Sequence, residues 1–310
     1  MRPLRKSRQL DDSLRHRERA LLSGSITLLL ASPTAALSVL IVVVIEMCMG
    51  PWLFAIATGL WLLAGVTLFD LGWFTPNRAA LAKIFGFRRP ISPETEILTT
   101  AWTNVTSAPG VDGWPYSLWV EQSSFLNAYA APTRIVAVTS WAVASLEPRQ
   151  LEAVLAHELG HQLHTDQRLR LLAAWSSIPT TVVQRLAGGP ALLMNAVGIR
   201  GNSEILVRFA LTTAALASLP FLLASTTGVP VALSLSALFI IEPLARAALR
   251  RREEFAADQT AVDLGYRQDY AAALHRLALD DLPPTGLLTL RNRWWSSHPP
   301  FTARLRALDR

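Results

Sequence analysis

Two long apolar blocks near the N-terminus restrict the folds open to this chain of 310 residues. The blocks run from about Ala20 to Met49 and from about Pro51 to Trp73, and each exceeds the roughly 20 residues that a helix needs to cross a bilayer. Two consecutive blocks of this length do not fit a cleaved signal peptide. Because Gly50-Pro51 favours a turn between them, residues 20–74 are predicted to form a transmembrane hairpin.

The composition and the charge pattern also indicate a membrane protein. Mean hydropathy is +0.30 and only 17% of the residues are charged, which is too apolar for an ordinary soluble enzyme. The net charge is +6, and the basic residues gather beside apolar blocks: in residues 1–19, from Arg78 to Arg89, and at Arg250-Arg251-Arg252. The positive-inside rule explains these bases better than nucleic-acid binding does. We therefore predict a multi-pass protein of the plasma membrane, with residues 1–19 as a basic cytoplasmic arm and no nucleic-acid partner.

The motif that carries chemistry is His157-Glu158-Leu159-Gly160-His161. Residues four apart on a helix lie on one face, about 5–6 Å apart between Cβ atoms, so the two imidazoles can hold one metal ion. Glu158 lies in a neighbouring sector, from which it can act as a base toward a metal-activated water. The alternative is a buried helix that contains two histidines by chance.

The residues around this motif favour a helix. Pro148 suits a first helical turn. Gly160 costs about 1 kcal/mol relative to alanine in a helix interior, a cost that is acceptable beside a metal or a close-packed helix. An apolar face follows at helical spacing, and its members are Leu151, Val154, Leu155 and Leu159.

The chain has a single cysteine, Cys48, so a cysteine zinc site is not possible and the remaining metal ligands must be histidines or carboxylates. A catalytic zinc site needs three protein ligands. Downstream, Glu254 and Asp258 lie four apart, so one carboxylate could bind the metal while the other accepts the N–H of a ligand histidine. Taken alone, this charge run could also be a solvated turn after a membrane span. We predict one catalytic Zn²⁺ on the basis of these ligand types.

The segment before the metal helix has an α+β pattern. Residues 94–105 could form a helix, and Ser117–Val120 and Arg134–Val138 are typical of short strands with turn residues between them. With the motif helix, this gives a predicted soluble domain over residues 75–170.

Two motifs in this chain resemble the HtpX-like membrane zinc metalloproteases, which are relatives of the CAAX prenyl endopeptidases. That family has H-E-x-x-H, followed by E-x-x-x-D after one or more membrane segments. Here these motifs are His157–His161 and Glu254–Asp258.

Two further elements extend the resemblance, which covers about residues 115–310 and includes the N-terminal pair of spans. An N-A-F-A element of the family appears as Asn127-Ala128-Tyr129-Ala130, with Tyr129 in place of the usual phenylalanine. The family's H-P-P appears as His298-Pro299-Pro300, and Arg304 stands at the position of its following arginine.

The resemblance implies a gluzincin-type metalloprotease domain and a role for each matching residue. The implied zinc ligands are His157, His161 and Glu254, with Glu158 as the general base. Asp258 and Arg304 would lie behind the ligands, and Asp258 would orient one of them. His298 would polarise the scissile carbonyl or stabilise its oxyanion. An extended substrate would pair with the strand at the edge of the cleft, whose residues are Asn127, Ala128, Tyr129 and Ala130.

The predicted fold is that of an α+β membrane protein, mostly helical, with a small β-sheet and about four transmembrane helices. The predicted function is an integral membrane zinc endopeptidase, with its active site facing the cytoplasm, that cleaves extended segments of membrane or misfolded proteins. This substrate class follows from family analogy alone. The oligomeric state is left open.

Two other functions are weighed against the protease. A non-catalytic membrane sensor or scaffold could keep a structural zinc site, but such a site has no use for Glu158 as a base and normally takes four protein ligands. A transporter would need more ionisable groups in mid-span than Glu242 and Arg185.

The membrane topology is constrained by parity. Because the implied ligands lie on both sides of residues 171–249, the chain must cross the bilayer an even number of times between them. The apolar candidates are Leu171–Ile199, Phe209–Thr226 and Gly228–Leu249. We predict that the first is an interfacial helix, because Arg185 lies near its middle and a charge there costs about 2.5–3.5 kcal/mol.

The other two stretches would then form a second hairpin, and residues 250–310 would return to complete the protease domain. The alternative pairs Leu171–Ile199 as a span with one long helix drawn from Phe209–Leu249.

Overall fold

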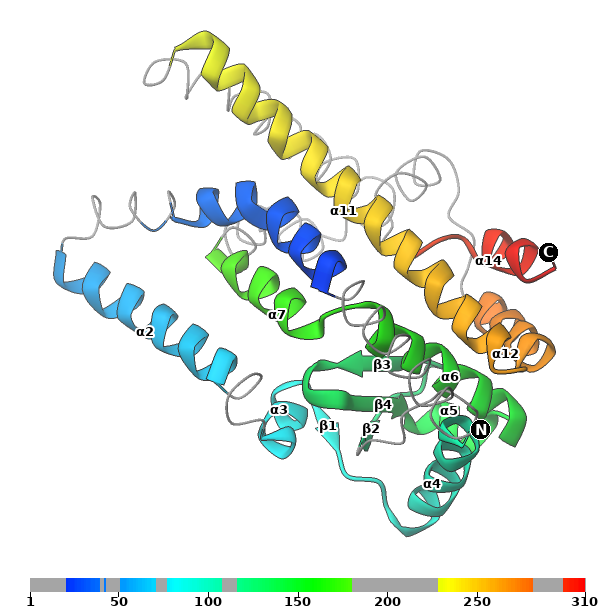
Figure 1. Ribbon diagram of the computed structural model, residues 1–310. Coiled ribbons are helices and arrows are strands. Elements are labelled where there is room, and N and C mark those ends of the chain that lie inside the picture. Colours follow the sequence, from blue (N-terminus) through cyan, green and yellow to red (C-terminus); the bar gives the residue numbers. More distant parts are fainter. Residues whose placement is uncertain are drawn as a thin grey trace, which may run out of the picture. The chain divides into compact units, whose positions relative to one another are not determined.

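The computed structural model describes residues 21–39, 42, 51–70, 77–107, 116–179, 228–280 and 298–309. The chain divides into two compact units. The sheet unit comprises Met1–Thr27, Gly65–Leu171 and Arg246–Arg310, and the helical unit comprises Leu28–Ala64 and Leu172–Ala245. The described part is mostly helical with one small mixed sheet (Figure 1), which confirms the predicted α+β class. The count of four membrane spans stays a prediction, because residues 180–227 lie outside the described ones.

The sheet of the sheet unit has four strands in the spatial order β1-β2-β4-β3. Its strands are β1 (Phe87–Arg88), β2 (Ser117–Glu121), β3 (Ala128–Ala131) and β4 (Ile135–Thr139). β2 and β4 are parallel, whereas β1 and β3 run antiparallel to their neighbours. Among the described strands, β3 therefore lies at an edge of the sheet. The two predicted strands, now β2 and β4, are each found within one residue of their expected bounds.

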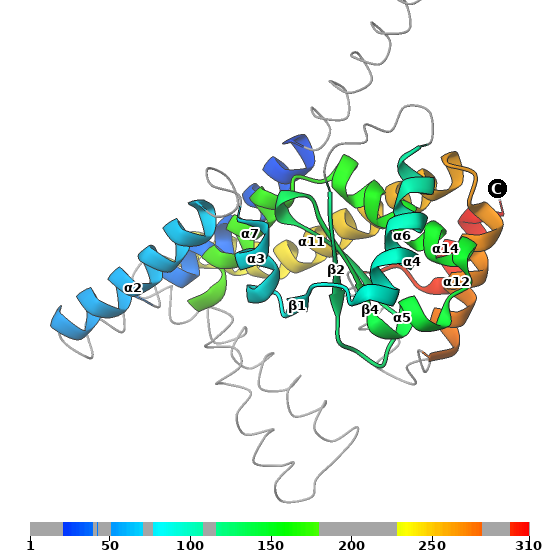
Figure 2. The same ribbon diagram turned by 90° about the horizontal axis from the view of Figure 1, so that it is seen from below.

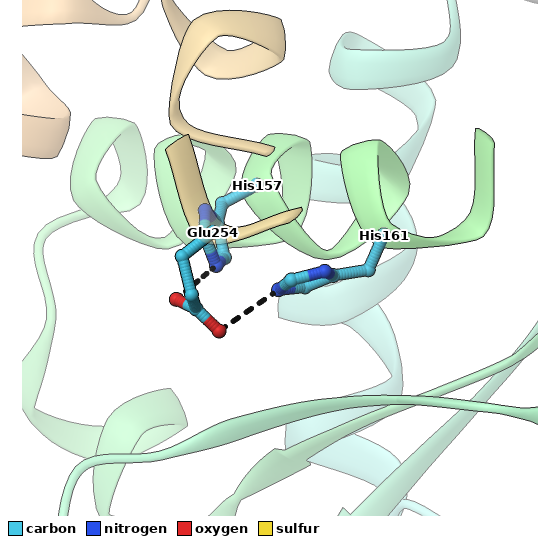
Figure 3. Close-up of side chains that lie close together, drawn as sticks. All are labelled: His157, His161 and Glu254. Atoms are coloured by element: carbon cyan, nitrogen blue, oxygen red, sulfur yellow. Dashed lines mark ion pairs between the residues drawn. The ribbon is translucent and has the colours of Figure 1, made fainter. Parts of the chain in front are cut away.

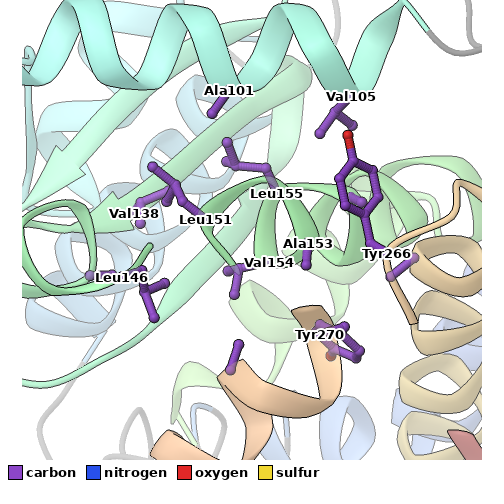
Figure 4. Packing of buried hydrophobic residues seen from close by; sticks show 14 of the residues in the cluster. Ala101, Val105, Val138, Leu146, Leu151, Ala153, Val154, Leu155, Tyr266 and Tyr270 are labelled. Atoms are coloured by element: carbon purple, nitrogen blue, oxygen red, sulfur yellow. The ribbon is translucent and has the colours of Figure 1, made fainter. Parts of the chain in front are cut away.

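Both faces of the sheet are covered, which explains why every residue of β4 is buried. α3 (Arg78–Ile84) packs against one face with Ile135 and Ala137. The opposite face, with Val136 and Val138, belongs to the larger core, to which α4 (Ser92–Thr106), α6 (Pro148–His164) and α12 (Arg267–Asp280) contribute (Figure 4). α4 and α6 lie side by side on this face (Figure 2).

α6 is the central helix of the sheet unit. It begins at Pro148, and the Gln150 side chain accepts a hydrogen bond from the backbone N–H of Glu147 at 3.4 Å. α4, α12 and β3 all contact α6, so its residues from Gln150 to Gly160 are buried on every side. The four residues of the predicted apolar face are buried as expected, but the polar residues between them are buried too. A helix enclosed on all sides is typical of a core helix, not of a surface helix.

Four further helices of the described chain lie between or after these elements. α5 (Ser140–Ser145) follows β4, and α7 (Gln167–Ser176) follows α6. The long helix is α11 (Val229–Asp263), and the last described helix is α14 (Phe301–Leu308).

The apolar helices belong for most of their length to the helical unit. Among the described residues, one helix, Leu21–Val39, has the length and apolar composition needed to cross a membrane. α2 (Pro51–Phe69) includes a shorter apolar stretch, and its Trp52 is 83% exposed. Within this unit Glu242 of α11 is buried, and its carboxylate accepts hydrogen bonds from the backbone N–H of Thr34 at 3.1 Å and from the Thr34 hydroxyl. A buried carboxylate in an apolar helix is thereby satisfied.

Candidate metal centre

α6 and α11 bring the H-E-x-x-H motif and the E-x-x-x-D motif together. α6 carries His157, Glu158 and His161, and α11 carries Glu254 and Asp258. The helices pass very close to each other at Gly160, where an added Cβ would lie 2.7 Å from the Cα of Ala257. The glycine in the motif helix is therefore explained by close helix packing, one of the two reasons expected from the sequence.

Three side chains from these helices point toward one position (Figure 3). Nε2 of His161 lies 3.5 Å from Oε1 of Glu254, and Nε2 of His157 lies 3.7 Å from Oε2 of the same carboxylate. One donor atom from each residue lies within 4.8 Å of the other two. The two imidazole rings meet edge to face, with centroids 4.7 Å apart.

The chemistry and spacing of these donors fit a zinc ion. Zinc bonds to histidine nitrogen and carboxylate oxygen are about 2.0–2.2 Å long, so tetrahedral ligands lie about 3.4 Å from one another. The separations of 3.5 and 3.7 Å, each measured to a different oxygen of Glu254, are close to that value. Two imidazoles and one carboxylate also leave a fourth position open, as in a catalytic site.

The Nδ1 atom of His157 takes part in a buried hydrogen-bond network. It lies 3.0 Å from Oδ1 of Asp258 and 2.8 Å from the hydroxyl of Tyr270. Because a carboxylate only accepts hydrogen bonds, we infer that Nδ1 carries the hydrogen, which leaves the lone pair of Nε2 for a metal. Burial would raise the pKa of Asp258, but hydrogen bonds from His157 and Arg304 outweigh it and lower the pKa to about 2.

Arg304 of α14 joins the two carboxylates of α11. It donates to Asp258 through Nε at 3.0 Å and Nη2 at 2.6 Å, and its Nη1 lies 3.2 Å from Oε2 of Glu254. Its side chain is only 6% exposed. The buried guanidinium binds Asp258 in a bidentate manner and also contacts Glu254, so its positive charge offsets the two buried negative charges.

His298 is the exposed neighbour of Glu254. Its Nδ1 lies 3.0 Å from Oε1 of Glu254, while 70% of its side chain is exposed. Burial would raise the pKa of Glu254, but hydrogen bonds from His161 and His298 hold that pKa well below its usual value. Glu254 is therefore ionised, as a metal ligand must be.

Glu158 lies beside the cluster without joining it. Its Oε1 is 4.0 Å from Nε2 of His157, and the residue is 6% exposed. The carboxylate is thus near the metal-facing nitrogen but outside the group of three donors, a position that suits a base more than a ligand.

The predicted substrate strand forms β3, with Asn127 just before it. Asn127 accepts a hydrogen bond from the backbone N–H of Thr139 at 3.1 Å, and its side chain donates to the Tyr129 hydroxyl at 2.9 Å. Burial, together with a hydrogen bond to Glu121, raises the pKa of Tyr129 to about 12. The tyrosine in place of the family's phenylalanine therefore keeps its proton and is satisfied by polar neighbours.

Gln162 of α6 forms hydrogen bonds with the backbone at the end of β3 and the start of β4. Its Nε2 donates to the carbonyl oxygens of Ala131 at 2.8 Å and of Ile135 at 3.0 Å. These carbonyls flank a tight turn in which Thr133 and Arg134 have φ values of 60° and 61°. Such values are unusual for residues other than glycine, so the turn needs support from its surroundings.

Sequence reasoning did not find Gln162 or Tyr270. Gln162 directly follows the motif, but its partners lie 31 and 27 residues upstream. Tyr270 reaches His157 across 113 residues, from a helix that starts after α11 ends. Spacing rules apply within one helix or strand, so they carry no signal for either contact.

Comparisons with known proteins agree with this geometry. The profile of peptidase family M48 matches residues 98–310. Protease HtpX of Xanthomonas euvesicatoria pv. vesicatoria (strain 85-10) is 30% identical over 203 residues, which cover 59% of this chain and 62% of that protein. Protease HtpX of Xanthomonas axonopodis pv. citri (strain 306) is 28% identical over 258 residues, which cover 77% and 79% of the two chains. The match to the first of these relatives thus spans less than two thirds of its length.

A solved structure aligns with most of the chain at a low score. The crystal structure of S. mikatae Ste24p aligns with 97% of this chain and 67% of its own, at 17% identity and a TM-score of 0.41. A score of this size does not establish a shared fold.

Proposed function

Because the chain belongs to peptidase family M48, we propose that it is a zinc-dependent endopeptidase of the membrane. The observation that carries this proposal is the convergence of His157, His161 and Glu254, whose donor atoms lie within 4.8 Å of one another. The buried carboxylate of Glu158 beside them supports catalysis in preference to a structural site, which would have no use for it.

Two residues of the chain have direct roles in the proposed hydrolysis of a peptide bond, Glu158 and His298. When bound, zinc activates a water molecule and polarises the substrate carbonyl. Glu158 removes a proton from the attacking water and passes it to the leaving amine. His298 donates a hydrogen bond to the carbonyl oxygen as negative charge develops there. The 3.0 Å distance between His298 and Glu254 supports this role, because it holds an exposed imidazole next to a ligand.

Asp258 and Arg304 act behind the ligands. Asp258 accepts the N–H of His157 and so keeps its Nε2 available for the metal, and Arg304 keeps Asp258 and Glu254 ionised in a buried setting. The distances of 3.0 Å from Asp258 to His157 and 3.2 Å from Arg304 to Glu254 support both roles.

β3 is the proposed site of substrate binding. In the described sheet it has a neighbour on one side only, which leaves backbone groups able to pair with an extended peptide. Asn127, Ala128, Tyr129 and Ala130 would line this edge. The class of substrate we propose is extended segments of membrane or misfolded proteins, because only a locally unfolded chain can add a strand.

We place the catalytic unit at the cytoplasmic face of a multi-pass plasma-membrane protein. The apolar helix Leu21–Val39 supports the membrane location. The basic residues on both sides of the apolar blocks support the orientation.

The test is zinc content and cleavage of an unfolded, dye-labelled protein by the full chain in detergent. Glu254→Gln should lose both properties, because an amide is a poor zinc ligand. Glu253→Gln is the matched control, since Glu253 is equally buried but accepts a hydrogen bond from Ser23 instead. The control should keep both. A wild-type chain that holds zinc but cleaves nothing would support the scaffold alternative, and a Glu254→Gln variant that holds zinc tightly would refute the ligand assignment.

A further inference from the structure

Tyr270 contacts Nδ1 of His157, the ring nitrogen that faces away from Glu254, and it belongs to none of the motifs found in the sequence. It is 2% exposed and comes from α12. Its ring stacks on the imidazole of His157, with centroids 5.3 Å apart and planes 20° apart. Its hydroxyl lies 2.8 Å from Nδ1 of His157 and 2.8 Å from Oδ1 of Asp258, and it also accepts a hydrogen bond from Arg304.

The hydrogen atoms in this network can be assigned from the chemistry of its members. Arg304 only donates and the ionised Asp258 only accepts, so the single hydroxyl hydrogen of Tyr270 goes to Asp258. The hydroxyl oxygen is then an acceptor for both Arg304 and the N–H of His157. In the opposite arrangement, an unprotonated Nδ1 would face the carboxylate oxygen of Asp258 at 3.0 Å without a hydrogen between them. The network is therefore satisfied only when Nδ1 is protonated.

The other histidine has no comparable support. Nδ1 of His161 is buried and has no hydrogen-bond partner among the residues that the structure describes. His157 is thus the histidine whose ring is oriented by neighbouring polar groups, and Tyr270 supplies both a second acceptor for its N–H and a flat surface for its ring.

We propose that Tyr270 is a positioning residue that, together with Asp258, fixes the tautomer and ring orientation of His157 for metal binding. This rests on the proposed function only in so far as His157 is taken to be a metal ligand. The Tyr270 hydroxyl contacts His157, Asp258 and Arg304, and Tyr270 is not one of the three metal donors. It acts through His157 and Asp258.

The test compares Tyr270→Phe with Tyr266→Phe in the full chain in detergent. Both changes remove one buried phenol hydroxyl and keep the ring. Tyr266 is 4% exposed and lies under the guanidinium of Arg149, at 4.6 Å from its ring centroid, so its hydroxyl is a control outside the network. The measurements are zinc affinity by competition with a coloured chelator, the absorption spectrum of the Co²⁺-substituted protein, and the melting temperature of the metal-free protein.

Tyr270→Phe is expected to weaken zinc binding about tenfold, the lower end of the 10–100-fold cost for a residue that orients a ligand, because Asp258 remains. It should also change the Co²⁺ spectrum, whereas Tyr266→Phe should leave both unchanged. If Tyr270→Phe lowers only the metal-free melting temperature and keeps zinc affinity and spectrum, its role is structural and the proposal is wrong. A wild-type chain that binds zinc but cleaves no peptide would refute the protease and leave the assignment of Tyr270 intact.

Discussion

Gly160→Ala tests whether close contact between α6 and α11 sets the geometry of the metal centre. The new Cβ would lie 2.7 Å from the Cα of Ala257 and 2.9 Å from the hydroxyl oxygen of Thr260. Thr260 can rotate away, but a backbone Cα cannot. Ordinary contact begins at 3.4 Å, so the two helices must separate by about 0.7 Å, the difference between 3.4 and 2.7 Å. That shift exceeds the roughly 0.2 Å tolerance of metal–ligand distances.

Two opposing terms determine the free energy of unfolding. Alanine gains about 1 kcal/mol of helix propensity over glycine, whereas forcing an extra methyl group into a packed core costs about 1–3 kcal/mol. Because the clash is with backbone, we expect a packing cost at the upper end of that range. After subtraction of the gain in helix propensity, the free energy of unfolding should fall by about 2 kcal/mol. Since Glu254 lies on the displaced helix and the histidines on the other, zinc affinity should also fall at least about tenfold, or 1.4 kcal/mol.

The assay is denaturant unfolding of the metal-free protein combined with zinc competition. Gly59→Ala in α2 is the control, because a Cβ at Gly59 meets nothing within 4 Å. The control should be neutral or slightly stabilising and should keep full zinc affinity. The account of this helix crossing is refuted if Gly160→Ala stabilises the protein as much as Gly59→Ala does and zinc still binds normally.

Three further predictions concern turnover, the edge strand and topology. His298→Ala should lower kcat more than it raises KM, since its contact strengthens in the transition state; steady-state kinetics showing unchanged kcat would remove it from the site. Gln162→Leu keeps the side-chain size but removes both hydrogen bonds that Gln162 donates to the edge of the sheet, so KM for an unfolded substrate should rise several-fold. An unchanged KM would contradict the idea that this attachment positions β3 for substrate binding. Reporter fusions after Met194 and Arg252 should read as cytoplasmic, and a fusion after Thr227 should read as external, because the second hairpin would turn there. An external reading at Arg252 would contradict a shared metal site, and an external reading at Met194 would favour Leu171–Ile199 as a span.

The parts of the site that sequence could predict are those that depend on one helix. His157 and His161 share a face because they are four apart, and Glu254 and Asp258 do so for the same reason. Pro148 begins α6 as expected, because its missing N–H is harmless in the first turn. β2 and β4 were predictable from their β-branched and apolar runs.

The rest depends on packing between distant segments. The enclosure of α6 on all sides results from α4, α12 and β3 meeting around it, and no local pattern encodes that. Tyr270 reaches the network because Gly265, with a φ of 88°, allows a turn between α11 and α12. The turn that carries Thr133 and Arg134 has unfavourable backbone angles that a sequence pattern would not predict, and it is held by a side chain from another element.

The measurement that tests the central claim most directly is zinc content and peptide cleavage of Glu158→Gln. Glu158 lies near the metal-facing nitrogen of His157 but outside the three donors, at 4.0 Å. The variant should therefore bind zinc with the affinity of the wild type while cleavage falls by about 10²-fold or more, the range for loss of a general base. A variant that still cleaves at near the wild-type rate, or one that loses its zinc, would contradict the assignment of Glu158 as a base and not a ligand.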